Sequence, residues 1–299
     1  MPGIPERETL DESLRHAPRF PVGGVRSVKV FLSVDMEGIC GIVGETETDP
    51  EKGGERYREN CHLMTQETNA AIEGCLEAGA KDVLVADSHW NFNNLLREEL
   101  HETARLFRGA PRPFSMVEGL DSSFDAALFI GFHAMRGAPR AIIDHTMSGR
   151  YRAVQVNGLD VGETALNAYL AGHHGVPVVL VTGDSTLAAE ARSFIPGVHT
   201  VAVKEPVSAG AAIHLHPKVA RARIREETAK ALADRKNIKP VRAKTPVEMA
   251  VDFSGTEYAD LGELLPGARR LGGTRIEFTS PDFREAYRTF EALSFISRP

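Results

Sequence analysis

Cysteine is scarce in this sequence, because the 299 residues include only Cys40, Cys61 and Cys75. Three cysteines form neither a disulfide framework nor a Cys-x-x-Cys zinc motif, so we expect a protein of the reducing cytoplasm. No stretch approaches the roughly 18 apolar residues of a membrane helix. Excess positive charge is missing too: the net charge is −6, and nothing indicates the basic face of a nucleic-acid-binding protein.

Common catalytic motifs are also missing. The sequence contains neither Gly-x-Ser-x-Gly nor His-Glu-x-x-His, the motifs of two widespread hydrolase classes. It contains no Walker loop and no Gly-x-Gly-x-x-Gly, so a nucleotide cofactor is not expected. Residues 1–27 mix arginines, acids and prolines without the apolar core of a secretory signal, and we predict a flexible extension outside the fold.

Short apolar segments that end in polar side chains are the main feature that is present. Residues 28–34 form a buried-strand pattern followed by Asp35 and Glu37. A second such segment, 82–86, is followed by His89, and a third, 126–130, by His133. Side chains two residues apart on a strand point the same way, so the two acids should face one site. On this stretch alone, a metal site and a pair of loop acids are about equally favoured.

Helical patterns separate these segments, over residues 55–78 and again over 95–107. Strands that alternate with helices at this spacing predict a mainly parallel α/β sheet with flanking helices, whose ligands bind beyond the carboxyl ends of the strands. Further helices are expected at 161–172, 218–235 and 282–296, and further strands at 151–156, 177–182, 200–204, 248–253 and 275–279. We predict an α/β domain over residues 28–200 and a smaller C-terminal α+β domain or cap over 201–299.

The polar side chains at this edge form a mixed set of oxygen and nitrogen donors that suits zinc, manganese or a similar divalent ion. Each residue also has an ordinary structural explanation. His89 could cap its turn, His133 could pack on Phe132, and His145 could stabilise its own loop. Glu163 could simply interact with the dipole at a helix N-terminus.

Several longer motifs resemble the D-aminopeptidases of the DppA type, peptidase family M55. They are, in chain order, Ser33-Val-Asp-Met-Glu-Gly-Ile39, Asp87-Ser-His89 with Asn93-Asn-Leu95, Phe114-Ser-Met-Val-Glu-Gly-Leu120, Gly131-Phe-His-Ala134, His145-Thr-Met147, and Val161-Gly-Glu163 with Asn167-Ala-Tyr169. The likeness runs from about residue 28 to the C-terminus, and only the first 27 residues are extra to the family pattern.

The resemblance implies a site with two zinc ions, although other divalent metals would also suit the donors. Asp35 would bridge the ions, Glu37 and His133 would complete one set of ligands, and His89 and Glu163 the other. The family's proposed catalytic histidine corresponds to His145, which would transfer a proton or polarise the scissile carbonyl.

The same resemblance implies a zinc-dependent aminopeptidase that removes the N-terminal residue of short D-amino-acid peptides such as D-Ala-D-Ala, through a water activated by two metal ions. Large homo-oligomers, a decamer in the best-known case, are also implied. Two alternatives remain open at this point. One is a di-metal hydrolase of another class, a phosphoesterase or an L-peptide or amide hydrolase. The other is a non-catalytic peptide-binding module.

Overall fold

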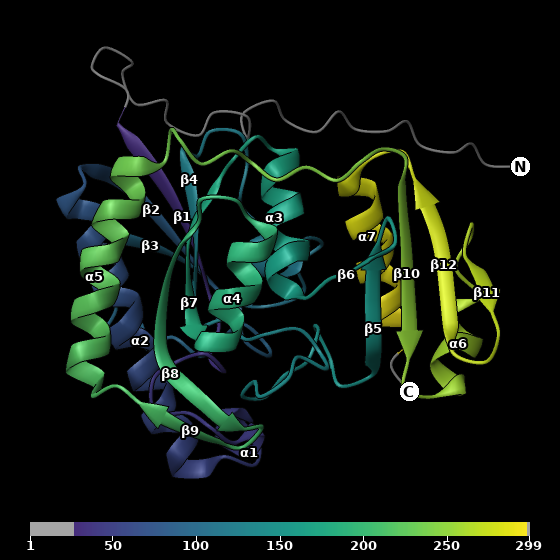
Figure 1. Ribbon diagram of the computed structural model, residues 1–299, viewed down its shortest axis with the longest axis horizontal. Helices are drawn as coiled ribbons and strands as arrows, with labels where there is room; N and C mark the ends of the chain where they lie inside the picture. Colours follow the sequence, from purple (N-terminus) through teal and green to yellow (C-terminus); the bar gives the residue numbers. More distant parts are fainter. Residues whose placement is uncertain (1–26, 298–299) are drawn as a thin grey trace, which may run out of the picture.

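A computed structural model describes residues 27–297. The predicted N-terminal extension therefore lies outside the described residues, except for residue 27. Within the described part, the strands form a seven-stranded sheet in the order β3-β2-β1-β4-β7-β8-β9 and a five-stranded sheet in the order β11-β12-β10-β5-β6. The predicted α/β class with a mainly parallel sheet is confirmed (Figure 1).

The large sheet is parallel from β3 to β8, and only the edge strand β9 is antiparallel. Its strands are β1 (Val28–Val34), β2 (Ala80–Asp87), β3 (Ala104–Phe107), β4 (Ala126–Ile130), β7 (Val178–Asp184), β8 (His199–Ser208) and β9 (Ala211–His214). The central strands β1, β4 and β7 are almost wholly buried, which explains their continuous apolar runs.

Helices cover both faces of this sheet (Figure 1). On one face, α2 (Gly54–Glu77) packs against α5 (Pro217–Asp234), and they share a core with β1 and β4. On the other face lie α3 (Glu163–His173) and α4 (Ser185–Phe194). The short α1 (Glu45–Thr48) and the 3₁₀ turn Ser115–Val117 complete this part of the molecule.

The second sheet is antiparallel and joins the same core as α3 and α4. Its strands are β5 (Tyr151–Val156), β6 (Leu159–Asp160), β10 (Val247–Phe253), β11 (Arg269–Leu271) and β12 (Arg275–Ser280). The remaining helices are α6 (Thr256–Gly262) and α7 (Phe283–Ile296), and α7 packs on α3. The turn signal at Asn157-Gly158 is confirmed, since it joins β5 to β6.

The two sheets do not correspond to the segments before and after residue 200, because each sheet contains strands from both segments. The β5–β6 hairpin pairs with β10 in the second sheet, whereas β8, β9 and α5 pack with the first. The reason is that β10 pairs with the edge of β5, and the buried side chains of β5 join the core that includes Phe290 of α7, which contacts Tyr151.

The helix predicted over residues 95–107 is wrong. The segment consists of turns followed by β3, which pairs with β2. Leu95 is buried as expected, but its N–H and that of Asn94 donate to the carboxylate of Asp87 instead of continuing a helix. A tertiary contact has thus outweighed the local helical pattern.

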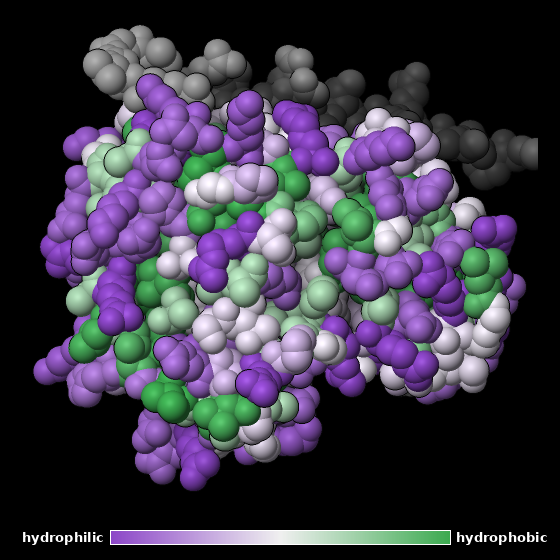
Figure 2. Space-filling view, in the orientation of Figure 1, coloured by the Kyte–Doolittle hydropathy of each residue, from purple (hydrophilic) through white to green (hydrophobic). Residues whose placement is uncertain are grey.

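The surface shown in Figure 2 is mainly hydrophilic along α5, and more apolar over the β8–β9 hairpin, where Val207 and Ile213 are exposed. None of the helices in the described residues is long and apolar enough to cross a membrane.

Candidate metal centre

Three adjacent parallel strands bring the predicted residues to one edge of the large sheet. Asp35 directly follows β1, His89 follows β2 and His133 follows β4. The register pairs Val34, the last residue of β1, with Asp87 in β2 and Ile130 in β4, so all three strands end at the same level. The strand that follows β1 in the chain, β2, lies on one side of it, and β4 lies on the other. Sheets of this kind bind ligands at the carboxyl end of the strand where the order reverses.

Two glycines allow the ends of β1 and β4 to approach each other closely. Gly131 has a φ of +71°, and a Cβ atom there would lie 2.3 Å from the carbonyl oxygen of Asp35. A Cβ atom on Gly38 would lie 1.9 Å from the carbonyl oxygen of Phe132. Any larger residue would push the two loops apart, so these glycines place the acids beside His133.

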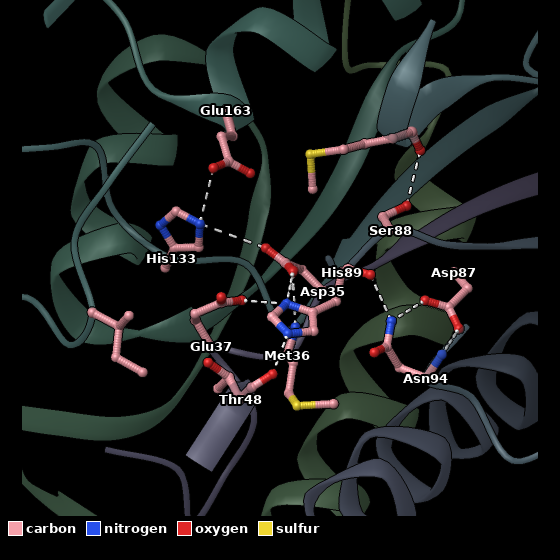
Figure 3. Close-up of polar contacts among 12 residues, drawn as sticks. Asp35, Met36, Glu37, Thr48, Asp87, Ser88, His89, Asn94, His133 and Glu163 are labelled. Carbon is pink, nitrogen blue, oxygen red and sulfur yellow. Dashed lines mark hydrogen bonds and ion pairs between the residues drawn. The ribbon is translucent and has the colours of Figure 1, made fainter. Parts of the chain in front are cut away.

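The first group of donors consists of Asp35, Glu37 and His89 (Figure 3). Nδ1 of His89 lies 3.2 Å from Oδ1 of Asp35 and 3.1 Å from Oε2 of Glu37. Each of the three residues is at most 5% exposed. A cation placed among these atoms would be shielded from solvent.

The second group consists of His133, His145 and Glu163, the first residue of α3. Nε2 of His133 lies 3.2 Å from Oε1 of Glu163, and Nε2 of His145 lies 3.4 Å from the same oxygen. The two imidazole rings are stacked with centroids 3.9 Å apart. Oδ2 of Asp35 is 3.6 Å from Nε2 of His133, so Asp35 faces both groups (Figure 3).

All six predicted site residues therefore meet at one place. Their grouping differs from the pairing implied by the resemblance, because Glu37 lies with His89 and Glu163 lies with His133. The cause is the strand order: β1 separates β2 from β4, and Glu37 turns toward the β2 side whereas α3 approaches from the β4 side.

Each imidazole has one nitrogen at a backbone carbonyl and the other at the carboxylates. Nε2 of His89 is 2.8 Å from the oxygen of Thr48. Nδ1 of His133 is 3.0 Å from the oxygen of Ala134, and Nδ1 of His145 is 2.9 Å from that of Ile143. A carbonyl oxygen only accepts, so these nitrogens carry the proton. Histidines that bind metals are usually held in this way.

One of the inward-facing nitrogens has no hydrogen bond. Nε2 of His133 is buried and, among the described residues, has no hydrogen-bond partner in suitable geometry, although a carboxylate oxygen is near. Buried polar atoms rarely lack a partner. A ligand that accepts its lone pair would satisfy it.

The pKa shifts show that the site favours positive charge. Burial and the nearby Glu37 raise the pKa of Asp35 well above its usual value. Burial also favours a higher pKa for Glu37, but His89 and His133 outweigh it and hold that pKa well below normal. Burial disfavours charge on both histidines, yet the carboxylates raise the pKa of each well above its usual value. Divalent cations would supply the same positive charge.

Sequence reasoning missed several polar residues that support the site. Lys204 in β8 is fully buried, and its ammonium donates to the carbonyl oxygens of residues 37, 39 and 42. Asp87, which lies in one of the quoted motifs, accepts from the loop that follows His89. A charged residue inside an apolar strand is the one signal that could have indicated Lys204.

Comparisons with known proteins identify the family of this chain. The model of the D-aminopeptidase family, peptidase M55, matches residues 28–292. The chain belongs to this family. A D-aminopeptidase of Bacillus subtilis (strain 168) is 40% identical over 268 residues, which cover 89% of this chain and 97% of the relative.

A solved structure is also similar: the Zn-dependent D-aminopeptidase DppA from Bacillus subtilis, a self-compartmentalizing protease. The TM-score is 0.87 at 38% identity, over 90% of this chain and 98% of that one. The resemblance seen in the sequence motifs is thus confirmed. As a member of the D-aminopeptidase family, this protein is a peptidase, that is, a hydrolase of peptide bonds.

Proposed function

We propose that this protein is a zinc-dependent aminopeptidase that removes the N-terminal residue from short D-amino-acid peptides of the D-Ala-D-Ala type, with two zinc ions per subunit. The observation that carries the proposal is the orientation of the three imidazoles, each of which holds one nitrogen at a backbone carbonyl oxygen and turns the other toward buried carboxylates, where it could bind a cation. The zinc dependence of the similar DppA structure supports the choice of metal.

The donors would form two sets, one for each ion, with Asp35 as the residue that both sets share. Glu37 and His89 would hold one ion, His133 and Glu163 the other, and Asp35 would contact both. Bound divalent ions of this kind supply Lewis acidity and activate water near neutral pH. The burial of the carboxylates excludes bulk water and strengthens every electrostatic interaction at the site.

In this proposal, His145 moves the proton. Its side chain is 23% exposed, so it borders the space that a substrate can reach. Burial and the neighbouring His133 lower the pKa of His145, which keeps the ring neutral near pH 7. Its Nε2 can therefore take a proton from the attacking water and return it to the leaving amine. The bond from Nδ1 to Ile143 holds the ring throughout.

Measuring hydrolysis with and without a chelator tests the function. We expect the zinc-loaded protein to release D-alanine from D-Ala-D-Ala, to act far less on L-Ala-L-Ala, and to lose activity in chelator. His145→Ala should abolish turnover and keep its zinc, whereas Glu37→Gln should bind less zinc. Chelator-insensitive hydrolysis, or no turnover of D-peptides by the zinc-loaded protein, would refute the proposal.

We also propose that the subunits form a large homo-oligomer, a decamer by analogy, in the cytoplasm. The self-compartmentalizing character of DppA supports assembly, and so does the exposed apolar pair Val207 and Ile213 on the edge hairpin. The three cysteines are buried free thiols in the described chain, as in proteins of reducing compartments. The mass of the particle in solution tests the assembly.

A further inference from the structure

The segment that carries His145 has an unusual backbone. In residues 135–150, all of which the structure describes, three residues other than glycine have positive φ: Arg140 at 54°, Ile143 at 51° and Met147 at 60°. A β-branched residue such as Ile143 rarely adopts this conformation. Such a conformation is strained and persists only where the surroundings enforce it.

Asp184 enforces the conformation on one side. This residue ends β7, is buried, and caps α4 by accepting from the N–H of Leu187 at 2.8 Å. Its second oxygen, Oδ2, accepts from the N–H of Ile142 at 2.9 Å. The start of α4 makes a second contact, because the hydroxyl of Thr186 donates to the carbonyl oxygen of Arg140. The chain is therefore fixed immediately before Ile143.

The left-handed turn at Ile143 has a direct consequence for His145. It places the carbonyl oxygen of Ile143 at 2.9 Å from Nδ1 of the His145 ring. That contact fixes the proton on Nδ1 and leaves the lone pair on Nε2, 3.4 Å from the carboxylate of Glu163. The orientation of the ring and its tautomer thus depend on one carbonyl group in a strained turn.

We propose that Asp184 and the left-handed turn at Ile143 are a positioning device for the histidine that transfers the proton. The inference rests on the proposed function for the role of His145. Asp184 does not touch the histidine, and acts through the N–H of Ile142. Its position one strand beyond β4 in the sheet lets a single carboxylate join the end of β7, the start of α4 and the catalytic segment.

Asp184→Asn separates the two roles of this carboxylate. The amide keeps one oxygen, which can still cap α4, but its NH₂ group cannot accept from Ile142. Loss of a supporting contact of this kind typically costs about 10–100-fold. We expect kcat on D-Ala-D-Ala to fall by that factor while KM changes less than about twofold and zinc content stays the same.

Asp282→Asn is the matched control. Asp282 caps α7 in the same way, by accepting from the N–H of Glu285, and it lies outside the site. We expect this variant to keep the wild-type kcat. Unchanged kcat in Asp184→Asn, or a fall in kcat matched by an equal loss of zinc, would overturn the positioning role.

Two further measurements keep the inference testable. Crystal structures of both variants should show the contact between His145 and Ile143 lost in Asp184→Asn alone. An unmoved ring would overturn the inference, and this holds even if the protein fails to cleave D-peptides. If Asp184→Asn does not fold, Ile143→Pro replaces it, because the proline ring fixes φ at about −65° and abolishes the left-handed turn. The same loss of kcat at constant KM is expected, and unchanged kcat would count against the inference.

Discussion

The two halves of the site are supported in different ways. Asp35, Glu37 and His89 follow the ends of adjacent strands, and buried polar groups fix their loops. His133, His145 and Glu163 come from a strand end, an irregular segment and a helix N-terminus. Both halves include residues other than glycine at positive φ, Trp90 and Phe92 after His89, and Ile143 and Met147 around His145, so the halves differ in how their loops are held.

Two buried side chains that support the first half, Lys204 and Asn94, have complete hydrogen-bond sets. All three protons of the Lys204 ammonium are used, at 2.6, 3.0 and 2.7 Å from the carbonyl oxygens of Glu37, Ile39 and Ile42. Beside it, Asn94 donates to Asp87 and to the carbonyl oxygen of His89. A buried network in which every group is satisfied is rigid. The comparison teaches that buried side chains hold the loops of the first half, whereas His145 in the second half depends on a left-handed turn held from the end of β7 and the start of α4.

The largest effect is expected from Asp35→Asn, because Asp35 is the residue that faces both halves. Replacing the carboxylate by a neutral amide should lower turnover of D-Ala-D-Ala by more than about 100-fold. Loss of a residue that only supports a metal ligand typically costs up to about 100-fold. Bound zinc should fall below that of the wild type, measured by elemental analysis.

A suitable control is Asp82→Asn. This carboxylate lies on β2, is partly exposed and pairs with Arg105 of β3. It should keep both activity and zinc. If Asp35→Asn keeps full zinc content, Asp35 does not link the halves and the comparison between them loses its centre.

An intermediate effect is expected from Lys204→Met. Methionine fills a similar volume but leaves three buried carbonyl groups without a donor, at a cost of about 3 kcal/mol or more in the free energy of unfolding. Burial lowers the pKa of Lys204 to about 8, but its hydrogen bonds keep the ammonium in place. Hydrogen exchange should accelerate in residues 37–42 and stay unchanged in 137–147.

Lys230→Met on the exposed face of α5 provides the control, since its ion pairs with Glu226 and Glu227 lie in solvent. Lys230→Met should lower the free energy of unfolding by less than about 1 kcal/mol. If Lys204→Met accelerates hydrogen exchange equally in residues 37–42 and 137–147, the two halves move as one unit, contrary to the comparison.

Much of the first half, and His133 in the second, could be predicted from sequence, because strand ends are local features. Apolar runs that stop at Asp35, His89 and His133 reveal both the sheet and the edge at which its strands end. The supporting contacts could not be predicted in this way. Lys204 lies 162–167 positions from the carbonyl groups that it binds, and Asp184 lies 42 positions from Ile142.

The second half was harder for a related reason. His145 was a candidate from the sequence, but its catalytic role came only from the family motif, because residues 141–145 form neither a helix nor a strand. No local pattern indicates a left-handed isoleucine, since this conformation is imposed by tertiary contacts. The mistaken helix over 95–107 has the same origin, in backbone groups that bind the side chain of Asp87.

The smallest effect concerns Glu67 in α2, which supports the first half by accepting from the N–H of Cys40 at 2.9 Å. Burial raises the pKa of Glu67 to about 7, whereas in the unfolded chain it is near 4.5. Between these values the folded state binds more protons than the unfolded state. This group therefore lowers stability as pH rises from about 4.5 to 7, by at most about 3 kcal/mol.

Glu67→Gln removes that pH dependence and keeps an oxygen for Cys40. Its free energy of unfolding, relative to the wild type, should rise by about 1–3 kcal/mol between pH 5 and pH 8 in denaturant titrations. Glu73→Gln, on the exposed face of the same helix, should change stability by less than about 1 kcal/mol at either pH. If Glu67→Gln shows no gain at pH 8, Glu67 is ionised at little cost, and the first half contains a stronger source of positive charge than Lys204 alone.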